Sequence, residues 1–107
     1  MGKTLYIIAG CNGAGKTTAS YTILPEIWHC QEFVNADEIA RGLSPLNPNS
    51  MAVQAGRIML QRIEELLKQG VSFSIETTLA TRSYVQLVKR AQAEGYVVNI
   101  LFFWLES

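Results

Sequence analysis

The chain has 107 residues, of which 49% are hydrophobic and 17% are charged. These values fit a single globular domain with a packed core and exclude an intrinsically disordered chain. Lys and Arg together number 9, as do Asp and Glu, so the formal net charge is zero and the broad basic surface of a nucleic-acid-binding protein is not expected.

The first half of the chain alternates predicted strands and helices. Residues 4–9 are apolar and rich in β-forming side chains, as in a strand that is buried on both faces. A glycine-rich loop follows, and Lys16 begins a predicted helix that ends near Pro25. A short strand is expected at residues 33–35, then a helical turn at 37–42 and a loop at 44–50.

The second half continues this alternation. The expected elements are a helix at residues 51–69 that is capped by Gly70, a strand at 71–75, a helix that begins at Thr81 or Ser83 and is ended by Gly95, and a strand at 97–105. One stripe of the first of these helices is expected to face the core, and it comprises Ala52, Ala55, Met59, Ile63 and Leu66.

The alternation of strands and helices predicts right-handed crossovers and a mainly parallel sheet, hence one three-layer α/β domain over residues 1–107. The strand at 97–105 is followed by only two residues. We therefore expect either a domain that is incomplete at its C-terminus or a partner that covers this strand, including self-association through it. This apolar run is half as long as a membrane-spanning helix, so we expect a soluble, cytoplasmic protein with no membrane partner.

The glycine-rich loop at residues 10–17 matches the pattern G-x-x-x-x-G-K-[ST] of a Walker A motif. Its glycines let successive backbone N–H groups point toward phosphate oxygens. Lys16 can reach the β- and γ-phosphates, and the Thr17 hydroxyl can ligate Mg²⁺. The motif therefore predicts a P-loop NTPase fold that binds ATP with Mg²⁺. The residues expected to contact the nucleotide are Gly10, Cys11, Asn12, Gly13, Ala14, Gly15, Lys16, Thr17 and Thr18.

Two acidic residues, Asp37 and Glu76, follow predicted strands at the edge where an open α/β sheet binds its ligands. A kinase needs one carboxylate that accepts the proton of the attacking hydroxyl and another that organises Mg²⁺. The spacing does not divide these roles. Asp37 could equally cap the helical turn that follows it, and Glu106 is a weaker Mg²⁺ candidate.

Four further polar residues are expected near the same edge of the sheet. Arg41 and Arg82 either contact phosphate or substrate, or are ordinary surface cations. Thr77 and Thr78 either form local hydrogen bonds or contact the substrate. The residue types alone do not choose between these alternatives.

Three segments together carry a resemblance to a known family: GCNGAGKTT at residues 10–18, NADEIARGLSP at 35–45 and SIETTL at 74–79. Their order and spacing resemble those of the zeta-toxin-like P-loop kinases, including the related predicted ABC-type ATPases, along nearly the whole chain. The resemblance implies a kinase that transfers the γ-phosphate of ATP to a hydroxyl of a nucleotide sugar such as UDP-N-acetylglucosamine.

The resemblance also implies roles for individual residues. Lys16 and Thr17 would bind the triphosphate and Mg²⁺. Asp37 would be the base for the sugar hydroxyl and Glu76 would position the substrate, while Arg41 lies in a matching segment without an assigned role.

Members of this family continue into a lid region with arginines that neutralise the transferring phosphoryl group, and this chain has no residues that correspond to it. The resemblance therefore implies the N-terminal part of such a kinase, and leaves an antitoxin protein open as a partner. Two alternatives stay open: a nucleotide-binding module or slow ATPase, and a fragment that binds ATP without catalysis.

Overall fold

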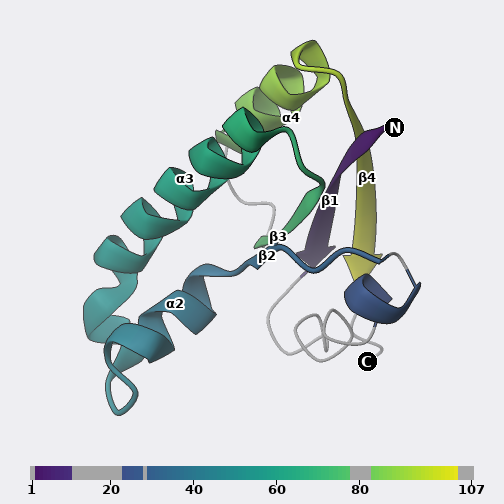
Figure 1. The fold of residues 1–107 in the computed structure, drawn as a ribbon. Coiled ribbons are helices and arrows are strands. Elements are labelled where there is room, and N and C mark those ends of the chain that lie inside the picture. Colours follow the sequence, from purple (N-terminus) through teal and green to yellow (C-terminus); the bar gives the residue numbers. More distant parts are fainter. Residues whose placement is uncertain (1, 11–22, 28, 78–82, 104–107) are drawn as a thin grey trace.

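The computed structural model describes residues 2–10, 23–27, 29–77 and 83–103 of the chain (Figure 1). Its strands are β1 (Lys3–Gly10), β2 (Phe33–Val34), β3 (Phe73–Thr77) and β4 (Tyr96–Phe103). Its helices are the π-helical turn η1 (Ile23–Ile27), α2 (Ala36–Leu43), the 3₁₀ turn η2 (Pro48–Met51), α3 (Ala52–Gln69) and α4 (Ser83–Ala93). The helix predicted to begin at Lys16 lies mostly outside the described residues.

The four strands form one sheet in the order β2-β3-β1-β4, and each neighbouring pair is parallel. A parallel pair needs a long crossover connection, which α2 and α3 supply between β2 and β3, and α4 between β3 and β4. Figure 1 shows α3 and α4 together on one side of the sheet. The predicted α/β fold with a parallel sheet is confirmed.

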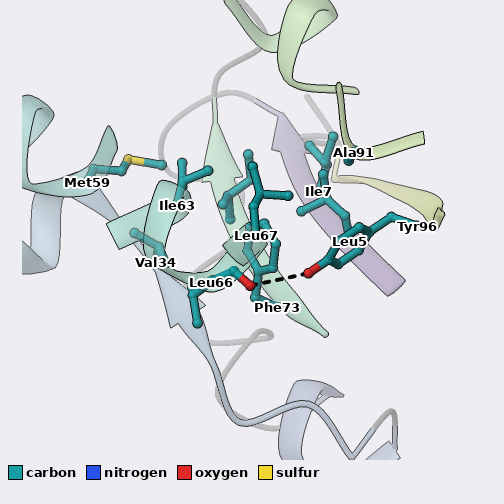
Figure 2. Packing of buried hydrophobic residues seen from close by; sticks show 11 residues of the cluster. Leu5, Ile7, Val34, Met59, Ile63, Leu66, Leu67, Phe73, Ala91 and Tyr96 are labelled. Carbon is teal, nitrogen blue, oxygen red and sulfur yellow. Dashed lines mark hydrogen bonds between the residues drawn. The ribbon is translucent and has the colours of Figure 1, made fainter. Parts of the chain in front are cut away.

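Alternating residues of β1 face two separate apolar clusters, which makes the sheet the middle layer of three. Leu5 and Ile7 pack into the larger cluster together with residues of α3 and α4 (Figure 2). Ile8 packs on the other side of the sheet against Leu24 and Cys30. Because β1 is covered on both faces, polar and apolar side chains do not have to alternate along it, as the sequence indicated.

Helix α3 follows the predicted apolar stripe along most of its length. Four of the five predicted residues are buried, whereas Ala52 is exposed and that assignment is wrong. Ala52 is the first residue of α3, in the turn next to η2 and away from the strands (Figure 1). At the other end Gly70 has φ = 70°, and its N–H group donates to the carbonyl oxygens of Leu66 and Leu67, which confirms the predicted cap.

Strand β3 begins and ends two residues later than expected, so Glu76 lies inside it and not after it. Val71 and Ser72, before the strand, bind other parts of the chain. The Tyr96 hydroxyl donates to the carbonyl oxygen of Val71 at 2.7 Å, and the Thr4 N–H group donates to Ser72 Oγ at 2.8 Å. The Tyr96 ring also meets Phe73 edge-on, with ring centroids 5.7 Å apart (Figure 2). These contacts fix the start of β3 to β1 and β4.

Strand β4 is the least covered strand of the sheet. The side chains of Val97, Ile100 and Phe102 are 58%, 59% and 42% exposed. Among the described helices, none has the length and apolar character that a membrane crossing requires.

Candidate functional site

Three strands end at the same edge of the sheet, and each brings a residue of interest to it. In the register of β1 and β3, Ile8 lies opposite Glu76 and Ala9 lies opposite Thr77. Glu76 is therefore near the end of β1, where Gly10 begins the Walker A motif. Asn35 follows β2, which pairs with β3 on the side of β3 away from β1. The carboxyl edge of a parallel sheet is where such folds bind ligands.

Gly10 has φ = 136°, a backbone conformation that residues with a Cβ rarely adopt. The chain therefore leaves β1 by a turn that requires glycine at the first position of the motif. The other predicted nucleotide ligands, Cys11 to Thr18 and with them Lys16 and Thr17, lie outside the described residues.

Asn35 caps helix α2, and sequence reasoning missed this role. Its side-chain oxygen Oδ1 accepts from the N–H groups of Asp37 at 2.8 Å and Glu38 at 3.3 Å. The backbone of Asn35 is extended, with φ = −139° and ψ = 117°, as at other N-caps. The alternative that Asp37 is the cap is wrong, because Asp37 lies inside the first turn of α2. The signal was present: asparagine between a strand and a helix is a favoured cap.

The same Asn35 side chain also binds the second predicted acid. Its Nδ2 group donates to Glu76 Oε2 at 2.5 Å, across 41 positions of sequence. Asn35 is itself only 5% exposed and Glu76 is half-buried, so this hydrogen bond is partly shielded from water. One amide thus binds the backbone N–H group of Asp37 and the side-chain carboxylate of Glu76.

Asp37 and Arg41 both project from the exposed part of α2, and they have different neighbours. The side chain of Asp37 is exposed. Arg41 forms an ion pair with Glu38 one turn earlier on the same helix, with 59% of its side chain exposed. An exposed pair of this kind contributes little to stability, so Arg41 can exchange Glu38 for another anion at small cost.

The remaining predicted site residues are only partly described. Thr77 ends β3, opposite Ala9 of β1, and its side chain lies outside the described part of the structure. Thr78, Arg82 and Glu106 lie outside it altogether.

A cavity of about 580 Å³ opens beside β2, next to this edge. Asn35, Glu38 and Arg62 contribute to its polar lining, and Leu24, Val34 and Ile58 to its apolar lining. Arg62 is held there by Glu32, with its Nη2 group 3.1 Å from Oε1 and 3.2 Å from Oε2. Cys30 also lines the cavity, and burial raises the pKa of its thiol, which favours the protonated and unreactive form.

Mg²⁺ binds oxygen ligands. Where it binds together with a nucleotide, the protein usually supplies only one or two of these ligands and the phosphates supply others. No group of three or more His, Cys, Asp or Glu side chains that would hold a metal by itself occurs among the described residues. Glu76, near the end of β3, has carboxylate oxygens of the kind that Mg²⁺ accepts, and one of them, Oε2, accepts a hydrogen bond from Asn35.

Comparison with known sequences decides the family. The zeta toxin family matches residues 2–106, nearly the whole chain. The chain belongs to the zeta toxin family. An uncharacterized protein of Haemophilus influenzae is 31% identical to it over 91 residues, which are 85% of this chain and 63% of that protein. Membership in this family of P-loop kinases implies nucleotide binding.

Solved structures of other proteins have the same fold. One from the PezAT chromosomal toxin–antitoxin system of Streptococcus pneumoniae has a TM-score of 0.78 at 18% identity, over 98% of this chain and 48% of that one. A sugar kinase from Janibacter sp. HTCC2649 has a TM-score of 0.53 at 23% identity, over 94% of this chain and 60% of that one. At these identities the likeness shows the fold. This member of the zeta toxin family spans about half of the length of the first of these two chains and three-fifths of the second.

Proposed function

We propose that this chain is the nucleotide-binding part of a kinase that transfers the γ-phosphate of ATP to a hydroxyl of a nucleotide sugar such as UDP-N-acetylglucosamine. The observation that carries the proposal is the link between Asp37 and Glu76 through Asn35, at the edge where Gly10 begins the Walker A motif. Membership in the zeta toxin family supports it.

In this proposal the loop from Gly10 to Thr18 holds the phosphates by its backbone N–H groups, and Lys16 contacts the β- and γ-phosphates. Thr17 would ligate Mg²⁺, whose chemistry is to neutralise the charge on the phosphate oxygens. Most of the catalysis in phosphoryl transfer comes from positioning and charge stabilisation. These residues would therefore act by holding the phosphoryl group in place.

Asp37 would accept the proton of the acceptor hydroxyl. Its exposed carboxylate can reach an incoming substrate, and its backbone is fixed by the cap that Asn35 provides. Glu76, with Thr77 beside it on β3, would bind and orient the acceptor. Arg41 would bind an anionic group of that acceptor in exchange for Glu38.

A protein partner is part of the proposal. The PezAT structure comes from a toxin–antitoxin system, so we propose that an antitoxin protein binds this chain as well. Self-association is a second proposal for a partner, and the exposed side chains of Val97, Ile100 and Phe102 on β4 support it.

Phosphorus NMR of the protein with Mg-ATP and a panel of hydroxyl acceptors, including UDP-N-acetylglucosamine, tests the function. We expect one acceptor to give a new phosphomonoester signal. Lys16→Ala and Asp37→Asn should each lower its rate by about a hundredfold or more. Glu26→Gln is the matched control, because it removes an exposed carboxylate on η1 and should leave the rate unchanged.

Two other results would contradict the proposed kinase. Formation of only ADP and inorganic phosphate would favour the slow ATPase. Nucleotide binding without turnover would favour a fragment that binds ATP without catalysis.

A further inference from the structure

Asn35 uses both ends of its side-chain amide, and they reach two different elements. The oxygen accepts the N–H groups of Asp37 and Glu38 at the start of α2. The nitrogen donates to the carboxylate of Glu76 on β3. Asn35 is 5% exposed, so its side of these part-buried hydrogen bonds is shielded from water.

An amide is the side-chain group that this arrangement requires. Serine, threonine and aspartate also cap helices, because they supply an acceptor oxygen. Aspartate, however, has no N–H group to offer a carboxylate, and serine is too short to carry a donor as far as the amide nitrogen does. The cap alone therefore does not explain asparagine at this position, whereas the cap together with the hydrogen bond to Glu76 does.

The amide also adds a side-chain link between α2 and β3, which the backbone joins only through β2. Helix α2 makes its main contacts with α3 and η2, whereas Glu76 belongs to a strand that is held by β1 and β2. A shift of α2 would move Asp37 relative to Glu76 unless something tied the start of this helix to β3. The two hydrogen-bonded ends of Asn35 form such a tie.

We propose that Asn35 is a positioning residue that fixes the separation of Asp37 and Glu76 and orients the Glu76 carboxylate toward the acceptor. This role rests on the proposed kinase function. Asn35 touches neither the nucleotide nor the acceptor in this proposal, and acts only through the two acids that it joins.

The first test measures unfolding in denaturant and needs no activity. Asn35→Asp keeps the cap but places a second carboxylate against Glu76, so we expect the unfolding equilibrium constant to rise about tenfold or more. Glu76→Gln in the same chain supplies a donor to that new carboxylate, so the double variant should recover most of the loss. If the effects of the two substitutions only add, the tie between the two positions does not exist and the proposal is overturned.

The second test measures phosphoryl transfer. We expect Asn35→Asp to lower kcat/KM for the acceptor about tenfold or more, with the Kd for ATP unchanged, because the acids are displaced and the nucleotide loop is not. The double variant should stay slow, since its hydrogen bond is restored but the Glu76 carboxylate is gone. If Asn35 and Glu76 both had only a structural role, the double variant would instead recover the rate along with the stability.

Ser74→Ala is the matched control. Ser74 is buried and its Oγ donates to the carbonyl oxygen of Glu32 at 3.0 Å, so this variant also removes a side-chain hydrogen bond between β3 and the residue before β2 but leaves Glu76 untouched. It should keep the wild-type rate. If Asn35→Asp transfers phosphate as fast as Ser74→Ala does, the positioning role is overturned. If the wild-type chain transfers none to any acceptor, the kinase proposal fails, and the unfolding measurement still decides whether Asn35 ties the two acids together.

Discussion

Strands β1 and β4 are hydrogen-bonded neighbours of eight residues each, and both are strongly apolar, but they differ in burial. Ile7 and Ile100 lie opposite each other in their register. Ile7 is 1% exposed and Ile100 is 59% exposed. An isoleucine of this sheet is thus in the core on one strand and on the surface on the neighbouring strand.

The difference comes from what covers each strand. Strand β1 lies between β3 and β4, with α3 and α4 on one face and η1 on the other. On β4 only some side chains, such as Val98 and Leu101, pack at the margins of the two clusters. Apolar composition therefore indicates a strand, and the neighbouring elements decide how much that strand contributes to stability.

Truncation at the centre of the sheet should have the largest effect. We expect Ile7→Ala to lower the free energy of unfolding by about 2–5 kcal/mol, because it leaves a cavity in the larger apolar cluster. Denaturant unfolding followed by circular dichroism measures this. A loss below about 0.5 kcal/mol would mean that Ile7 is not a core residue.

An intermediate effect is expected where β4 does reach the core, at Tyr96. Its hydroxyl donates to the carbonyl oxygens of Val71 and Leu66, while the ring packs against Phe73 (Figure 2). Tyr96→Phe keeps the ring and removes the donor, so we expect a loss of about 1 kcal/mol. Tyr96→Leu separates the two contributions, since it removes the ring as well and should cost more.

A small effect is expected at the exposed partner of Ile7. Ile100→Thr keeps a β-branched side chain on β4 and should change the free energy of unfolding by less than about 0.5 kcal/mol. The same denaturant measurement applies. A loss as large as that of Ile7→Ala would show that β4 is covered in solution, by a second copy for example, and its dependence on protein concentration would then identify the cause.

The smallest effect is expected for an ion pair between α3 and α4. Arg90 donates to Glu64, which lowers the pKa of this exposed carboxyl below 4.5. Its contribution is then present above pH 4.5 and is lost as the pH falls through the lowered folded-state pKa. Glu64→Gln should therefore be slightly less stable than the wild type near pH 6, and this difference should shrink as the pH falls below 4.5 or as salt is added.

The sequence predicted the fold well because its elements depend on local patterns. Apolar strands, helical spacing and the cap at Gly70 are all visible within a few neighbouring residues. Ala52 was misassigned because spacing gives the face of a helix but not the point along it where the sheet ends.

The candidate site was predicted less completely. Asp37 and Glu76 were expected at one edge because both follow strands, but the hydrogen bond from Asn35 to Glu76 spans 41 positions and has no local signature. Only the pairing of β2 with β3 brings the two residues together.

The direction of the helices has a further consequence for a chain whose formal net charge is zero. Helix α2 begins two residues after the last residue of β2 and so presents its partly positive end to the carboxyl edge of the sheet, while α3 and α4 are followed by Gly70 and Gly95, which lie next to the side chain of Lys3 at the start of β1, on the opposite edge. The ammonium group of Lys3 thus offsets the partly negative helix ends at that edge. At the other edge the partly positive end of α2 is offset in the same way, by the carboxylates of Asp37 and Glu38 in its first turn, so this neutral molecule balances its helix ends locally.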